Sequence, residues 1–276
     1  MEHNHNHTHV QIDYNKAFSF GIILNVIYII VEFVFGLRIN SMALIADAGH
    51  NLSDVLGLLL AWGATYLAKT STTTNRTYGL RKSTILAALF NSIILLIAVG
   101  AITIEAARKF ISPEPVQGTT MIIVAGFGFV INTLTAILFL KGKEKDINIK
   151  GAFIHMAADA GVSLGVVAAG VLITITNWLW IDPAIGIAIA IVITIGTWDL
   201  LKKSFMLSMD AVPGNINVPK VKQYLTSLPN VKDIHDLHIW GMSTTETALT
   251  VHLVLEKFPA DNQLLETINK KLQNEF

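Results

Sequence analysis

Two apolar stretches of this sequence carry histidine and aspartate at the same spacing: Ala46-Asp47-Ala48-Gly49-His50-Asn51-Leu52-Ser53-Asp54 and His155-Met156-Ala157-Ala158-Asp159-Ala160-Gly161-Val162-Ser163. In each stretch a His precedes an Asp by four residues. A helix places residues with this spacing on one face, one turn apart. The same H-x-x-x-D pattern therefore occurs twice, in two segments that are otherwise apolar.

The composition around these stretches is that of a membrane protein. The chain has 276 residues, of which 52% are hydrophobic and 14% are charged, and its mean hydropathy is +0.54. Soluble domains usually contain about 25% charged residues. Lys plus Arg and Asp plus Glu both number 20, and this balance argues against nucleic acid as a partner. The absence of cysteine from the sequence excludes disulfides and thiolate metal sites.

Six segments are long enough to cross a bilayer, because about 20 mostly apolar residues span its hydrocarbon core. They are residues 17–37, 41–68, 80–106, 118–140, 148–176 and 180–201. From about Ser204 the polarity is ordinary, which predicts a small soluble domain. We therefore expect three parts: a His-rich tail at 1–16, a six-helix transmembrane domain at 17–203 and a C-terminal domain at 204–276.

The distribution of basic residues predicts the orientation of the spans. With an internal N-terminus, Arg38, Arg108 and Lys109 are the basic residues near the outer ends of the spans. The inner segments then hold Lys16, Lys69, Arg76, Arg81, Lys82, Lys141, Lys143, Lys145, Lys150, Lys202 and Lys203. The positive-inside rule places both termini and the soluble domain in the cytoplasm.

Spans two and five stand out because they contain ionisable residues at membrane depth. Such a residue costs at least about 2.5 kcal/mol on insertion scales, so it usually faces a functional polar interior and has a partner. A helix-to-helix hydrogen bond is the simpler alternative for a single His or Asp. For two matched pairs we favour a common site, in which His50, Asp54, His155 and Asp159 point toward one another.

Two imidazoles and two carboxylates suit a tetrahedral zinc ion. Manganese and magnesium prefer all-oxygen, near-octahedral sites, so the two histidines favour zinc or cobalt. Close approach of the two helices requires small residues. Candidates for this role are Gly49, Gly57, Ala158, Gly161 and Gly165.

The charges of this site predict competition between metal and protons. A bound divalent ion neutralises two carboxylates, whereas the empty site favours protonation. Histidine titrates near physiological pH and can take part in the exchange. A site that opens to each side in turn would then exchange zinc for protons.

These residues resemble the zinc-type branch of the cation diffusion facilitator family. The similarity covers nearly the whole chain and includes the segment 41–50 with Asp54, His155 with Asp159, Asp182-Pro183, the segment 210–213 and the segment 231–240. The resemblance implies a homodimeric six-helix antiporter that moves zinc, and also cobalt or cadmium, out of the cytoplasm in exchange for protons. It implies the same four transport ligands, and a supporting or proton-transfer role for Asp47.

The sequence also departs from the family pattern. Lys82 and Thr84 stand where Arg and Glu are usual, so an ionic contact on the cytoplasmic side is expected to change. The loop Lys69–Thr77 has no His or Asp, and the accessory metal site of some relatives is therefore expected to be absent. The loop Lys141–Lys150 lacks the His-rich insert of organellar relatives, which favours a prokaryotic inner membrane.

The C-terminal part reads as a helix at 219–227, strands at 231–240 and 246–256, and a helix at 261–274. We expect a small α+β ferredoxin-like domain that lacks the last strand found in the family. In relatives, regulatory metal ligands match His235 and His252, with partners on that strand. For His235, His238 and His252, metal binding and a solvated sheet face are both open.

The N-terminal segment contains His3, His5, His7 and His9, a composition typical of metal-binding tracts. We expect it to capture zinc weakly.

Two other functional classes compete with a transporter. A membrane zinc sensor would bind zinc without flux. An intramembrane zinc hydrolase would need an open coordination position, whereas four protein ligands saturate the ion. We therefore do not expect an enzyme.

Overall fold

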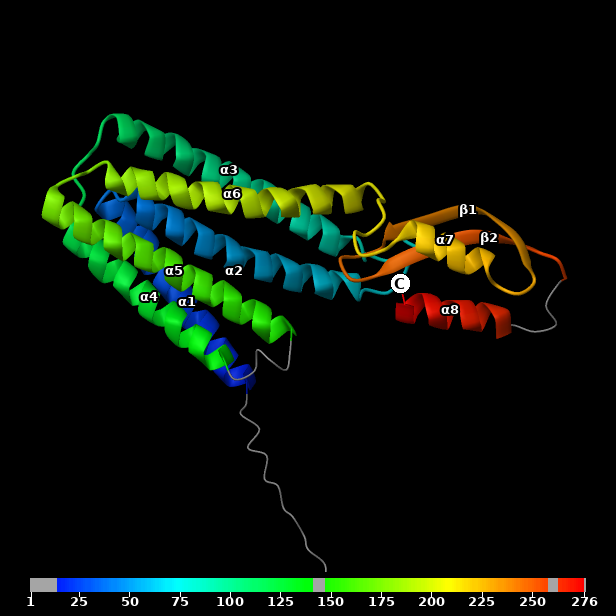
Figure 1. Cartoon of the computed structure of the whole chain (residues 1–276). Coiled ribbons are helices and arrows are strands. Elements are labelled where there is room, and N and C mark those ends of the chain that lie inside the picture. Colours follow the sequence, from blue (N-terminus) through cyan, green and yellow to red (C-terminus); the bar gives the residue numbers. More distant parts are fainter. Residues whose placement is uncertain (1–13, 141–146, 258–262, 276) are drawn as a thin grey trace, which may run out of the picture. The chain divides into compact units, whose positions relative to one another are not determined.

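The computed structural model describes residues 14–140, 147–257 and 263–275. His3, His5, His7 and His9 lie outside these described residues. Six long helices come first: α1 (Tyr14–Arg38), α2 (Met42–Ala68), α3 (Ser83–Ile111), α4 (Gly118–Leu140), α5 (Ile147–Thr176) and α6 (Ile181–Ser208) (Figure 1). They are followed by α7 (Val218–Thr226), β1 (Val231–Gly241), β2 (Thr247–Leu255) and α8 (Gln263–Glu275).

The expected six-helix transmembrane fold with a small α+β domain is confirmed, although α3 and α6 continue well past their predicted C-terminal ends. α3 ends at Ile111 rather than near 106, and α6 ends at Ser208 rather than near 201. In both cases the basic residues that limit the apolar run, Arg108 and Lys109 or Lys202 and Lys203, are themselves helical. Lys and Arg are good helix formers, so a span can end where its helix continues.

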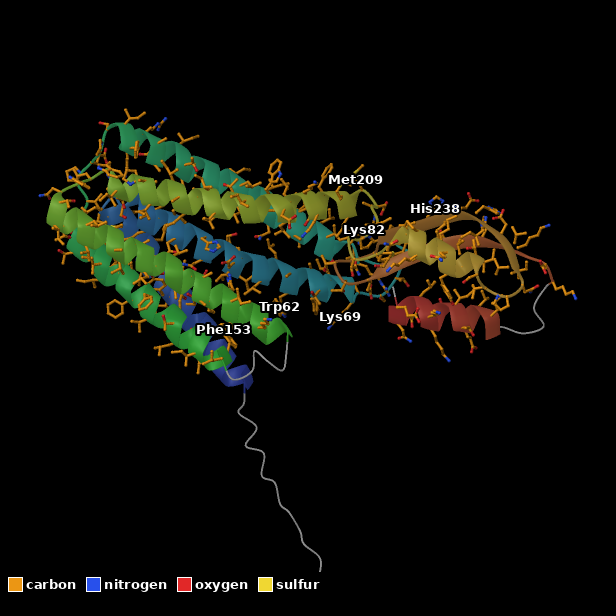
Figure 2. The ribbon with its side chains drawn as sticks, viewed as in Figure 1. Trp62, Lys69, Lys82, Phe153, Met209 and His238 are labelled. Atoms are coloured by element: carbon orange, nitrogen blue, oxygen red, sulfur yellow. The ribbon has the colours of Figure 1, made fainter. Side chains whose placement is uncertain are left out.

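The helices are suited to a lipid environment. Within the described residues, α2, α3, α4, α6 and most of α5 are long and apolar enough to cross a membrane, and α1, a helix of 25 residues, is the further span. Large apolar side chains are exposed on them, including Ile97 and Val192. Trp62, which is also exposed, is labelled in Figure 2. These side chains would be costly in water and are stable against acyl chains.

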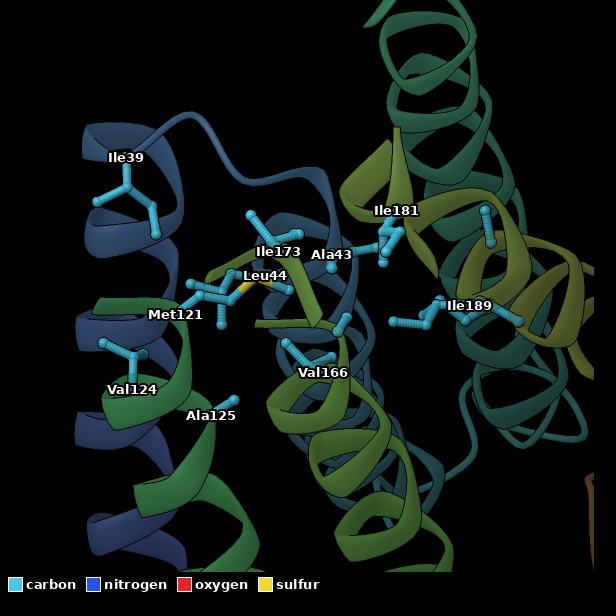
Figure 3. Close-up of a cluster of buried hydrophobic side chains, with 14 of the residues drawn as sticks. Ile39, Ala43, Leu44, Met121, Val124, Ala125, Val166, Ile173, Ile181 and Ile189 are labelled. Carbon is cyan, nitrogen blue, oxygen red and sulfur yellow. The ribbon is translucent and has the colours of Figure 1, made fainter. Parts of the chain in front are cut away.

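By its internal contacts the chain divides into two compact units. The first consists of Met1–Val55 and Leu95–Ile195, and the second of Leu56–Ile94 and Gly196–Phe276. The core of the first unit is made of buried aliphatic side chains from α2, α3, α4, α5 and α6 together with Ile39, and Phe35 of α1 packs against them. Figure 3 shows Ala43 and Leu44 of α2 with Met121 of α4 and Val166 of α5 in this core.

Small residues allow α4 and α5 to pack side by side (Figure 1). A Cβ atom added to Gly170 would lie 2.9 Å from Ile122 Cγ1 and 3.1 Å from the Gly118 carbonyl oxygen. The expectation that Gly161 and Gly165 let α5 approach α2 is wrong. A Cβ at either position would meet no described atom within 4 Å, so the close contact made by glycine in α5 is with α4 instead.

The N-terminus of α2 is fixed by a carboxylate from another helix. Ser41 is the cap residue, and its Oγ accepts from Leu44 N–H at 3.3 Å. Asp182 at the start of α6 accepts from Met42 N–H at 2.6 Å, Ala43 N–H at 3.2 Å and Ser41 Oγ at 2.5 Å. Three of the first N–H groups of α2, which have no partner inside the helix, are thereby satisfied.

The second unit contains the small α+β part. β1 and β2 form an antiparallel two-stranded sheet. Beside this sheet, Val221, Leu225 and Ile268 of the two flanking helices form a small core with Ile234 and Ile239. The order of helix, two strands and helix is the predicted one.

An ionic contact at Lys82 is present in this unit. Lys82 Nζ lies 2.5 Å from Asp210 Oδ1, and Arg81 Nη1 lies 2.9 Å from Glu246 Oε2. Thr84 accepts a hydrogen bond from Thr244 N–H at 3.1 Å through Oγ1. The departures from the family pattern at Lys82 and Thr84 are thus accommodated by one ion pair and one neutral hydrogen bond.

Asp182→Asn is expected to destabilise the protein, because an amide has one acceptor oxygen where the native carboxylate accepts three hydrogen bonds. We expect the free energy of unfolding to fall by about 1–3 kcal/mol, measured by reversible unfolding in mixed micelles. Asp199→Asn, an exposed position on the same helix, is the control and should change stability by less than about 0.5 kcal/mol. Equal stability of the two variants would contradict this account of the α2 cap.

Candidate metal site

The structure brings together the four residues predicted from the repeated H-x-x-x-D pattern. His155 Nε2 lies 3.3 Å from Asp54 Oδ2 and 3.6 Å from Asp159 Oδ2. His50 Nε2 lies 3.6 Å from Asp159 Oδ1 and 3.8 Å from Asp54 Oδ2. Each imidazole of one helix therefore faces a carboxylate of the other helix as well as its own.

These separations match those between the ligands of a small tetrahedral ion. Zinc binds nitrogen and oxygen at about 2.0 Å, which puts neighbouring ligand atoms of a tetrahedron about 3.3 Å apart. Asp54, His155 and Asp159 each offer a donor atom within 4.8 Å of the others. His50 of α2 lies outside this group of three, although its Nε2 is within 3.8 Å of both carboxylates.

The charge and burial of the four side chains are uneven. Asp159 is almost completely buried, whereas the side chains of His50, Asp54 and His155 are 25%, 35% and 43% exposed. With both carboxyls ionised and both histidines neutral, the four side chains carry a net charge of two negative units. A divalent cation balances this charge, and protons on the histidines or carboxyls are the alternative. The arrangement can therefore bind a divalent ion or protons.

Asp47 lies beside the site and is wholly buried. Ser163 Oγ donates to Asp47 Oδ2 at 3.1 Å, and Asn51 Nδ2 donates to Asp47 Oδ1 at 3.4 Å. These contacts hold the carboxylate between α2 and α5, and its supporting or proton-transfer role stays a prediction.

Ser163 and Asn51 were not among the residues predicted from the sequence. Their spacing in the sequence could have indicated them, since Ser163 follows Asp159 by one helical turn and Asn51 follows Asp47 by one helical turn. Polar residues that continue a polar helix face are natural partners for its charged members.

A second cluster of metal-binding side chains lies on the exposed sheet of the second unit. His235 and His252 are directly opposite in the β1–β2 register, and their ring centroids are 4.9 Å apart. Asp236 Oδ2 lies 3.1 Å from His235 Nδ1 and 3.2 Å from His252 Nδ1. The two predicted histidines are therefore brought together. His238, labelled in Figure 2, is opposite Thr250 and outside this cluster.

Asp236 was not predicted as part of this cluster, because adjacent residues of a regular strand point to opposite faces. The strand is irregular between His235 and His238, and Asp236 has a positive φ of 52°. This bulge turns the carboxylate to the histidine face. A hydrogen bond from His235 and the charges of nearby histidines lower the pKa of the Asp236 carboxyl. The group is thus kept ionised, as a metal ligand must be.

The fold and the first site together define a class: a polytopic helical membrane protein with a candidate cation site between its spans and a small α+β domain after them. The chain belongs to the cation efflux family. Residues 19–207 match the family model of the cation efflux transmembrane domain, and residues 213–276 match that of the cation efflux protein cytoplasmic domain. The resemblance to the cation diffusion facilitators is confirmed.

Similar proteins come from several bacteria. The metal cation efflux system protein CzcD of Cupriavidus metallidurans is 34% identical over 239 residues, covering 87% of this chain and 76% of the relative. The cadmium, cobalt and zinc/H(+)-K(+) antiporter of Bacillus subtilis is 34% identical over 255 residues, covering 90% and 80%. The zinc transporter ZitB of Pectobacterium atrosepticum is 31% identical over 264 residues, covering 95% and 82%.

We predict that the sheet cluster binds one divalent ion in addition to the site between the helices. In the full-length protein in detergent, His252→Ala should weaken zinc binding at this cluster at least about tenfold, measured by calorimetry, because one of three ligands is lost. His238→Ala is the matched control and should leave both binding events unchanged. Identical titrations for His252→Ala and the wild type would show that the cluster is only a solvated polar face.

Proposed function

We propose that this protein exports zinc from the cytoplasm in exchange for protons, by exposing its intramembrane site to each side of the membrane in turn. The observation that carries the proposal is the convergence of His50, Asp54, His155 and Asp159 from two helices, at separations of 3.3–3.8 Å. Four donor groups saturate the ion and leave no position for activated water. This arrangement suits transient carriage of an ion better than hydrolysis.

Zinc is the substrate that the donor set and the relatives both favour. Two imidazoles with two carboxylates prefer zinc or cobalt to magnesium or manganese. ZitB is named a zinc transporter, and the Bacillus relative is named for cadmium, cobalt and zinc. We extend zinc to this chain as its main substrate, with cobalt and cadmium as further ones. The ion is cargo in this scheme, and a regulatory ion at His235, Asp236 and His252 would be separate.

Proton exchange follows from the charge of the site. When zinc leaves, Asp54 and Asp159 would strand two negative charges at a low dielectric, and proton binding to the site avoids this state. When zinc enters, it displaces those protons. Zinc and protons therefore occupy the site alternately, and the antiporter name of the Bacillus relative supports this scheme.

We place the protein in a bacterial cytoplasmic membrane with both termini inside, in line with the charge distribution of the loops and the bacterial relatives. We also propose a homodimer, because the cytoplasmic-domain family matched by residues 213–276 is named for a dimer. The N-terminal histidines would raise the local zinc concentration at the inner mouth.

His50→Ala and Asp159→Ala are each expected to abolish zinc transport, because loss of one ligand leaves an incomplete and unbalanced site. The test uses proteoliposomes with a zinc dye inside and a pH dye outside, under an imposed zinc gradient. Wild-type protein should move zinc and protons in opposite directions. Asp199→Ala, which changes an exposed carboxylate on α6, should retain wild-type flux.

Wild-type flux in either ligand variant would refute the site assignment. Zinc binding by the wild type with neither zinc flux nor proton movement would favour the sensor, in which the cytoplasmic domain reports occupancy.

A further inference from the structure

Glu32 of α1 is a fully buried carboxyl group outside the four-residue metal site. Tyr28, one turn earlier on the same helix, donates from its hydroxyl to Glu32 Oε1 at 2.6 Å. Among the described residues, Oε2 has no regular hydrogen bond, although the side chains of Asp47 and Asn51 lie within reach of this carboxyl. A single donor is little compensation for an ionised carboxylate without water.

Glu32 and Asp47 face each other from α1 and α2 as interacting carboxyl groups. Asp47 is also fully buried, and in the part of the chain that the structure describes neither group forms an ion pair with a Lys, Arg or His side chain. Two buried carboxyls in contact resist double ionisation, since like charges repel strongly at a low dielectric. Sharing one proton removes this repulsion and supplies a donor between them.

We propose that Glu32 and Asp47 form a second proton site, which holds one exchangeable proton and is separate from the four metal ligands. The inference rests on the proposed zinc/proton exchange and deepens it, because it assigns one of the exchanged protons to a pair that does not bind the ion. When zinc binds nearby, the proton leaves the pair as a hydrogen ion and both carboxyls are ionised. When zinc departs, one proton returns.

The pair lies close enough to the metal site for the charge at one to affect the other. Asp47 precedes His50 by three residues on α2, so it lies one turn from a metal ligand. Ser163, which donates to Asp47, follows Asp159 by one turn on α5. Two positive charges brought to the metal site lower the cost of a second negative charge on the pair.

The surroundings of the pair contain few other titratable groups. On α1 the hydroxyl of Tyr28 donates to Glu32, and on α2 and α5 the charges of His50 and Asp159 act on Asp47. α4, which packs against α1, has no Asp, Glu, His, Lys or Arg. It contributes Gly128, whose missing side chain makes room for the Tyr28 hydroxyl. Tyr28 is thereby held in place to bind one oxygen of Glu32.

The test is the number of protons that zinc displaces. Full-length protein in detergent is titrated with zinc by calorimetry between pH 6 and 8, and the slope of log Kd against pH gives the protons released per zinc. Glu32→Gln should lower the magnitude of this slope by about one, which is a tenfold smaller change in Kd per pH unit. Glu105→Gln, an exposed glutamate on α3, is the matched control and should keep the wild-type slope.

The visible spectrum of bound cobalt shows whether the four-ligand site is intact in each variant. A wild-type slope in Glu32→Gln with an unchanged cobalt spectrum would overturn the proposal. If Glu32→Gln does not fold, Tyr28→Phe tests the same point. Without the Tyr28 hydroxyl, the ionised Glu32 loses its hydrogen-bond donor, so the midpoint of proton release should move to higher pH. An unchanged midpoint would also overturn the proposal. Failure of the proposed function is distinguishable, since the wild type itself would then show no zinc flux.

Discussion

The pairing of two imidazoles with two carboxylates between α2 and α5 is the interaction on which the membrane part of this protein depends. An isolated carboxylate is costly at a low dielectric, so Asp54 and Asp159 are acceptable only where positive charge can reach them. Each lies within 4 Å of both histidines. This requirement fixes the rotation of both helices about their axes, because a turn of either helix would leave a carboxylate against lipid or an apolar core.

The rest of the first unit supports this pairing. Asp182 holds the N-terminus of α2 through backbone N–H groups, and the aliphatic core from α2, α4, α5 and α6 holds the helices against one another. Asp47 extends the polar contact from α2 to Ser163 of α5 and to Glu32 of α1. Asp47 thus links polar groups of α1, α2 and α5 inside an apolar bundle, and a change of charge at His50, Asp54, His155 or Asp159 alters the electrostatic potential at these groups.

The second unit places His and Asp side chains in a different physical setting. His235, Asp236 and His252 are exposed, so their ionisation costs little and their geometry comes from strand pairing. The register of β1 and β2 sets the two histidines opposite each other, and a local irregularity adds the carboxylate. The intramembrane site must be neutralised to be stable, whereas this cluster tolerates either an ion or solvent.

Hydropathy and charge alone determined the six spans and the soluble part, because a bilayer demands long apolar helices and penalises each ionisable residue that they contain. The same penalty singled out His50, Asp54, His155 and Asp159, since their helical spacing is visible in the sequence. Tertiary structure decided the rest. Gly170 packs against α4 although sequence reasoning assigned small residues of α5 to α2, and Glu32 gained a partner that a single apolar span does not reveal. Asp236 joined its histidines only because a bulge reversed the direction set by strand alternation. Each of these depends on which helices or strands become neighbours, and on the local backbone geometry that their packing imposes.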